Sequence, residues 1–115
     1  MTNDGAANGV TLINVFTVDP GRQDELVELL VRATEDVMSK QPGYLSARIH
    51  RSLDGGKVAV YARWRSTDDI RALAENTDAA AHMRRARSLA SFEPVLYEVV
   101  RTHEAPTAEG QPTTG

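Results

Sequence analysis

Histidine, tryptophan and arginine supply the side chains of this chain best suited to chemistry. His50 alternates with other polar residues along a predicted strand, and an imidazole with an ordinary pKa of about 6.5 suits proton transfer near neutrality. An exposed histidine on a sheet is the simpler interpretation, and the residues alone favour it. His82 and His103 are weaker candidates, because one lies on an arginine-rich helix and the other begins a polar tail.

Trp64 is the single tryptophan of the chain and ends a predicted strand. It can serve as a core anchor, the commoner use of a buried aromatic residue, or as the wall of a ligand pocket. Arg84 belongs to a helix that also carries Arg85 and Arg87. Such runs usually face solvent, but Arg84 could instead turn toward the sheet and stabilise a substrate oxyanion.

Several classes of function are excluded by what the sequence lacks. It has no cysteine, hence no disulfide or thiolate metal site, and no phosphate-binding glycine loop, nucleophile elbow or dinucleotide fingerprint. We therefore expect no cofactor and no metal. A net charge of −3 with interspersed signs favours neither nucleic acid nor a membrane as partner. No signal-peptide pattern or long apolar run is present, so we expect a cytoplasmic protein.

The first half of the chain predicts a strand followed by a helix. Residues 10–18 are β-branched and aromatic, as strands prefer. Asp19 and Pro20 then fit the N-cap and first position of a helix. An apolar stripe carries this helix from residue 23 to about residue 40, where Pro42-Gly43 ends it.

The second half predicts two strands, a broken helix and a last strand. Residues 44–52 and 57–65 read as strands joined by a tight hairpin at Asp54-Gly55. Ser66 to Asp69 has the form of a helix start. The helix then runs over residues 70–75 and, after recapping at Asn76-Thr77-Asp78, over 79–89; Pro94 precedes a strand at 95–100.

This order predicts an α+β, ferredoxin-like βαββαβ domain, with two helices on one face of a four-stranded antiparallel sheet. Val58, Val60, Ala62 and Trp64 share one face of their strand. Ile13 and Val15 point to the face opposite Leu12 and Phe16, and Tyr44, Ser46, Arg48 and His50 lie opposite Leu45, Ala47 and Ile49. Because helices cover one face only, apolar residues on the other predict a homodimer packed sheet against sheet.

The 115 residues fit one domain. The polar ends, residues 1–8 and 103–115, are expected to be disordered, which leaves a folded domain over residues 9–102.

Six segments of the chain are similar to segments of the antibiotic biosynthesis monooxygenase family: residues 13–18, 20–21, 42–47, 50–55, 61–66 and 92–99. The resemblance implies a dimeric α+β barrel. It also implies cofactor-independent oxidation of an aromatic polyketide-type phenol or anthrone by molecular oxygen. In that reaction the deprotonated substrate passes an electron to oxygen, and the radicals recombine to a hydroperoxide that loses water. The implied partners are a second copy of the chain, a small aromatic substrate and oxygen.

The same resemblance assigns roles to individual residues. His50 would be the base, with Asn14 and Arg84 stabilising the substrate anion. The substrate-binding walls would be formed by Trp64, Val60, Phe16, Ile70 and Met83. Val60 stands where the family usually has an asparagine, and Ile70 where some members have a tyrosine, so the pocket is more apolar than the family pattern.

Two other functions are compatible with the same pocket. One is a polyketide cyclase of the same fold, in which His50 would promote enolisation and the product would lose water rather than gain oxygen. The other is a non-catalytic aromatic-ligand-binding or accessory protein, which the apolar Val60 and Ile70 favour. A haem-degrading function is disfavoured, because His82 lies too far along the chain from Trp64.

Overall fold

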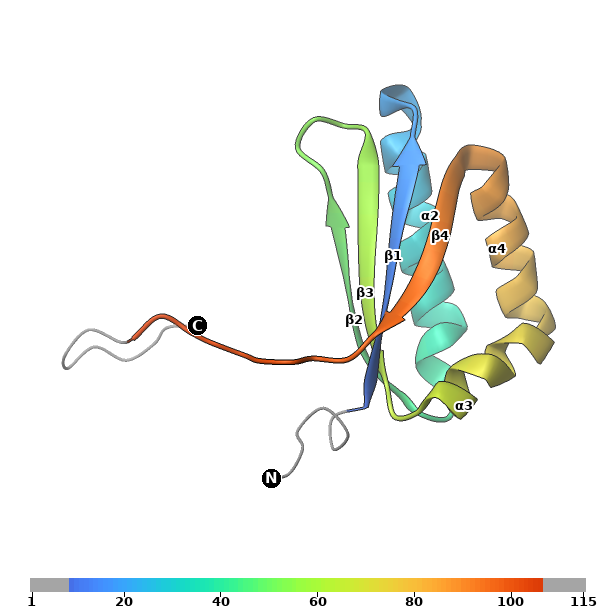
Figure 1. The fold of residues 1–115 in the computed structure, drawn as a ribbon. Helices are drawn as coiled ribbons and strands as arrows, with labels where there is room; N and C mark the ends of the chain where they lie inside the picture. The colour runs from blue at the N-terminus through green and yellow to red at the C-terminus, as the bar shows by residue number, and fades with distance from the viewer. Residues whose placement is uncertain (1–8, 107–115) are drawn as a thin grey trace.

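The computed structural model describes residues 9–106 and confirms the ferredoxin-like α+β fold (Figure 1). A single four-stranded sheet has the order β2-β3-β1-β4, and every pair of neighbouring strands is antiparallel. Helices α2 and α4 cover one face of this sheet. The ends predicted to be disordered are residues 1–8 and 103–115. Residues 1–8 and 107–115 lie outside the described residues, and residues 103–106 are in neither helix nor strand. The strands are β1 (Val10–Val18), β2 (Tyr44–Arg51), β3 (Lys57–Trp64) and β4 (Ala90–Tyr97).

The first helix, α2 (Gln23–Asp36), is shorter than the sequence predicts. It follows a 3-10 turn, η1 (Pro20–Arg22), whose N-cap is Asp19; the Asp19 side chain makes no cap hydrogen bond. Instead of continuing to residue 40, the chain tightens into a second 3-10 turn, η2 (Met38–Lys40). Gly43 then turns the chain into β2 with a φ of 87°, a conformation that favours glycine.

The second helical region has the predicted break. Ser66 caps α3 (Thr67–Arg71) by accepting a hydrogen bond from the Asp69 amide at 3.2 Å. After the 3-10 turn η3 (Ala72–Glu75), Asn76 Oδ1 accepts from the Ala79 amide at 2.9 Å and caps α4 (Thr77–Leu89). Both caps satisfy amides that have no partner inside the helix.

The last strand corrects the sequence-based prediction. β4 begins at Ala90 and ends at Tyr97, whereas the sequence predicted a strand over 95–100 preceded by Pro94. Pro94 lies inside the strand, paired with Asn14 of β1. β4 is an edge strand, and proline is tolerated there because its missing N–H need not pair with a neighbour.

An irregularity at the start of β2 produces a second correction. Tyr44 pairs with Trp64 of β3 and Ser46 pairs with Arg63, so Leu45 is an extra residue, a β-bulge. Simple alternation placed Tyr44 opposite Ala47, but the bulge brings both residues onto the helix-covered face. The predicted alternation holds for Ala47 to His50.

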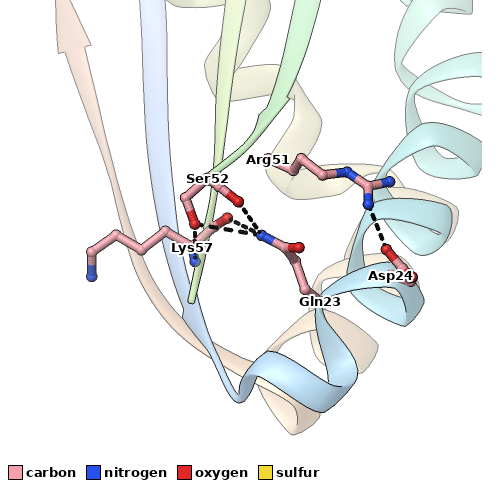
Figure 2. A network of polar contacts seen from close by, with 5 residues as sticks. All are labelled: Gln23, Asp24, Arg51, Ser52 and Lys57. Carbon is pink, nitrogen blue, oxygen red and sulfur yellow. Dashed lines mark hydrogen bonds and ion pairs between the residues drawn. The ribbon is translucent and has the colours of Figure 1, made fainter. Parts of the chain in front are cut away.

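A polar network holds the β2–β3 hairpin against the start of α2 (Figure 2). The buried Gln23 side chain donates through Nε2 to the carbonyls of Ser52 and Lys57 at 3.1 and 2.9 Å. Beside it, an exposed ion pair joins Arg51 and Asp24 at 2.7 Å. This network fixes the hairpin end of the sheet, while the apolar core of Phe16, Val18, Leu26, Leu30, Val58 and Ala86 lies between sheet and helices.

The sheet face away from the helices stays partly apolar in the single chain. Val15, Tyr61, Val95 and Tyr97 are each between 42% and 47% exposed. A shallow groove on this face is lined by both polar and apolar residues, among them Ile13, Arg48, His50 and Tyr61. Within residues 9–106, no helix combines the length and the apolar character required to cross a membrane.

Candidate active site

A cavity of about 260 Å³ lies between the sheet and the helical layer. Alternating residues of β1 and β3 form its floor, and residues of α2, η3 and α4 form its roof. The lining is overwhelmingly apolar: Leu12, Asn14, Phe16, Leu30, Ala33, Thr34, Met38, Tyr44, Ala47, Val60, Ala62, Trp64, Leu73, Ala74, Ala79, Ala80, Met83 and Pro94. Small-molecule pockets start at a volume of roughly 300 Å³, so the cavity suits a compact, flat, apolar ligand.

Two residues that line the cavity each carry a buried polar atom with no hydrogen-bond partner among the described residues. The two atoms are Oδ1 of Asn14 and Nε1 of Trp64. Asn14 is 9% exposed and Trp64 is 1% exposed. An unpaired buried polar atom costs about 1–3 kcal/mol, so such atoms are rare in folded proteins. A ligand that offers a donor to Asn14 and an acceptor to Trp64 would remove both costs if the two side chains turn these atoms toward the cavity.

The two unpaired atoms belong to residues well separated along the sheet. Asn14 pairs with Val60 across β1 and β3, and Trp64 lies four residues further along β3. Four residues of a strand span about 13 Å. The polar groups therefore sit toward opposite ends of the cavity floor, with Val60 and Ala62 between them.

The end of the cavity near Trp64 also contains Tyr44. Their rings meet edge to face, with centroids 5.5 Å apart. Burial raises the pKa of the Tyr44 phenol above its ordinary value. Tyr44 is the one lining residue in the described chain that carries an acidic proton, and this phenol is neutral at physiological pH.

The structure brings together five of the eight residues that the sequence singled out. Asn14, Phe16, Val60, Trp64 and Met83 all line the cavity. Trp64 was interpreted either as a core anchor or as a pocket wall. The structure gives it both positions, because this fully buried residue also lines the cavity.

The other three residues lie elsewhere. His50 is exposed on the opposite sheet face, where it lines the groove and meets the ring of Tyr61 edge to face at 5.4 Å. The sheet separates its imidazole from the cavity. Arg84 follows Met83 on α4, but its side chain is exposed and outside the lining. Ile70 of α3 is half-buried and also outside it. The roles assigned to these three residues stay predictions.

Sequence reasoning missed most of the helical roof and one polar residue of the floor. Thr34 and Met38 line the cavity from the C-terminal half of the first helical region, and Leu73 and Ala74 line it from η3. Tyr44 was assigned to the wrong face because a bulge leaves no mark in hydrophobic alternation. The one sequence feature that could have drawn attention to Tyr44 is the presence of an aromatic residue directly after Pro42-Gly43.

No group of three or more histidine and carboxylate side chains within residues 9–106 is arranged to hold a metal ion.

A family model of antibiotic biosynthesis monooxygenases matches residues 9–87. The chain belongs to that family. It is 41% identical over 100 residues to tetracenomycin-F1 monooxygenase of Streptomyces glaucescens, a match that covers 87% of this chain and 89% of the relative.

Solved structures of the antibiotic biosynthesis monooxygenase family agree with this assignment. The monooxygenase ActVA-Orf6 of Streptomyces coelicolor, in complex with nanaomycin D, superposes with a TM-score of 0.75 at 30% identity, covering 86% of this chain and 93% of that one. A mutant of SnoaB, a cofactor-independent oxygenase from Streptomyces nogalater, gives 0.73 at 26% identity, covering 81% and 94%. The family resemblance inferred from the sequence is confirmed, and the chain is a monooxygenase by family.

Proposed function

We propose that this chain oxidises a flat aromatic polyketide-type phenol or anthrone with molecular oxygen, without a cofactor, in the cavity that Trp64 lines. The observation that carries the proposal is an apolar cavity lined by Asn14 and Trp64, each of which holds a buried polar atom with no partner among the described residues. Relatives of the same family include a cofactor-independent oxygenase and a structure with nanaomycin D bound.

The spacing of the polar groups suits fused rings with oxygen atoms along their edges. A planar substrate would lie along the cavity floor, over Val60 and Ala62, between Asn14 and Trp64. Trp64 can only donate, so it would hold an oxygen that carries negative charge once the substrate loses a proton. Asn14 would accept from a substrate hydroxyl through Oδ1. The apolar lining would exclude water and strengthen both contacts.

The cavity lining contains no carboxylate or imidazole. Its part in the reaction is therefore to stabilise the substrate anion, which lowers the pKa of the substrate itself. Electron transfer from this anion to oxygen, recombination and loss of water then give the quinone. The proton acceptor lies outside the lining residues, and His50 and Arg84 are the predicted residues whose contribution needs a direct test.

Oxygen uptake with an anthrone, measured with an oxygen electrode, tests the proposal. We expect uptake by the wild type that matches formation of the anthraquinone, whose mass shows one added oxygen and the loss of two hydrogens. Arg84→Ala tests whether this exposed side chain contributes; if it reaches the cavity mouth, turnover falls by about tenfold or more. The absence of any oxygen uptake would refute the oxygenase function. With an uncyclised polyketide as substrate, a product that has only lost water would instead indicate the cyclase.

One observation favours a second candidate, an aromatic-ligand-binding protein without turnover. Tyr44 is the one lining residue of the described chain with an acidic proton, and its raised pKa keeps the phenol protonated near neutrality, so the lining supplies no base. Binding of an anthraquinone with no oxidation of the matching anthrone would support this candidate.

We also propose that the working unit is a homodimer formed through the open sheet face. Val15, Tyr61, Val95 and Tyr97 lie on that face and remain 42–47% exposed in the single chain. A second sheet packed over them would bury this apolar surface, which gains about 25 cal/mol for each Å² removed from water.

A further inference from the structure

Tyr44 has a position in the cavity that its strand would not give it by ordinary alternation. Leu45 is an extra residue opposite β3, so Tyr44 pairs with Trp64 while Ser46 pairs with Arg63. Leu45 itself is 48% exposed. A bulge of this kind turns one side chain to the other face, and bulges are over-represented beside active sites. Here the side chain turned inward is the phenol of Tyr44.

The backbone around the bulge is held from both sides. Gly43 has a φ of 87°, and a Cβ built on it would collide with the side chain of Asp69. Its carbonyl accepts a hydrogen bond from the Arg65 amide at 2.7 Å, immediately after Trp64. The start of β2 is thus tied to the end of β3, and the tie fixes Tyr44 beside Trp64.

The side chain of Tyr44 is half-buried, and this burial raises the pKa of its phenol above the ordinary value. At neutral pH the phenol is a neutral hydroxyl, as for any tyrosine, which donates one hydrogen bond and can accept others. It stands edge-on to Trp64, whose Nε1 donor has no partner among the described residues. Two donors at the same end of an apolar cavity can together recognise oxygen atoms on one edge of a ring system.

We propose that Tyr44 is a specificity-determining residue whose hydroxyl hydrogen-bonds a ring oxygen of the substrate at the Trp64 end of the cavity. This inference rests on the proposed function for the identity of the substrate class. It adds that the substrate carries a hydroxyl or carbonyl oxygen at that end, so an otherwise identical ring system without it is a poorer substrate.

Tyr44→Phe tests the inference, because phenylalanine keeps the edge-to-face ring contact and removes only the hydroxyl. Turnover is compared with 1,8-dihydroxyanthrone and with anthrone, which lacks the two hydroxyl groups. We expect the wild type to prefer the hydroxylated substrate in kcat/KM, and Tyr44→Phe to lower that preference by about tenfold, the effect of one lost hydrogen bond. The matched control is Tyr97→Phe, because Tyr97 is a tyrosine of β4 outside the cavity lining. This variant should keep the wild-type preference.

A binding measurement separates this inference from the proposed function. Trp64 is the single tryptophan, so quenching of its fluorescence reports binding of the unreactive 1,8-dihydroxyanthraquinone and anthraquinone. If no anthrone is oxidised but Tyr44→Phe still lowers the ratio of the two affinities by about tenfold, the proposed function fails and the role of Tyr44 stands. An unchanged ratio in both assays, or no binding of either anthraquinone, overturns the role of Tyr44.

Discussion

Replacing Asn14 by leucine should make the protein more stable and less active. Asn14 is only 9% exposed, and its Oδ1 has no hydrogen-bond partner among the described residues. Leucine has the same branching at Cγ and no polar atoms, and the adjoining cavity offers room for its larger volume. In the empty protein the substitution therefore removes an unsatisfied group from the cavity floor. In the complex it removes the acceptor that the proposed function assigns to the substrate hydroxyl.

The size of both effects follows from the burial of Asn14. An unsatisfied buried polar group costs about 1–3 kcal/mol, so Asn14→Leu should raise the free energy of unfolding by about 1 kcal/mol or more. In a domain of this size that raises Tm by roughly 4–8 °C. The loss of one substrate hydrogen bond in a dry site should lower kcat/KM by at least about tenfold.

Differential scanning calorimetry and oxygen uptake with 1,8-dihydroxyanthrone measure the two quantities on the same samples. Asn76→Leu is the contrasting control, because the Oδ1 of Asn76 does have a partner, the Ala79 amide at 2.9 Å. Loss of that helix cap should lower stability by about 1 kcal/mol. The two asparagines should therefore shift Tm in opposite directions.

The reasoning is refuted if Asn14→Leu lowers Tm, since Oδ1 would then have a stabilising partner in solution. It is equally refuted if kcat/KM stays within about twofold of the wild type, a change too small for a lost substrate hydrogen bond.

Four further predictions follow from the same structure. His50→Ala should change kcat/KM by less than about threefold, because the sheet separates His50 from the cavity; a hundredfold loss would establish it as the base. Val60→Asn places a donor opposite Asn14 and should raise the rate of oxygen uptake, by up to about a hundredfold; an unchanged rate would show that no donor is needed there. Gln23→Ala should lower the free energy of unfolding in urea by about 1–3 kcal/mol, whereas the exposed Asp24→Ala should cost less than about 1 kcal/mol; equal losses would contradict the network in Figure 2. For the proposed homodimer, light scattering should give twice the chain mass for the wild type and the single-chain mass for Val15→Glu; a monomeric wild type would refute the homodimer, and a dimeric Val15→Glu would place the interface elsewhere.

The sequence was sufficient for the fold because each element carries a local signal. The apolar stripe of α2, the recapping at Asn76 and the alternation of β3 are all properties of neighbouring residues. Alternation also placed Val60 and Trp64 correctly on the face that the helices cover.

The parts that could not be predicted depend on contacts between distant segments. The bulge at Leu45 exists only relative to β3, so nothing in β2 alone assigns Tyr44 to the cavity. Pro94 looked like the start of a strand because its tolerance inside β4 depends on the strand's place at the sheet edge. The family resemblance grouped His50 with the cavity residues, but alternation from Ala47 puts it on the other face.

The roof of the cavity differs from its floor in a way that bears on how new substrates could be accepted. Four alanines, at positions 33, 74, 79 and 80, contribute to the helical side, whereas the two residues proposed to anchor the substrate, Asn14 and Trp64, belong to strands. Exchanging an alanine for valine or leucine would shrink the space above the ring plane without moving Asn14 or Trp64. Exchanging a larger roof residue such as Met83 for alanine would enlarge it. Descendants of this scaffold can thus diverge in the number of rings they admit while retaining one common way of anchoring them.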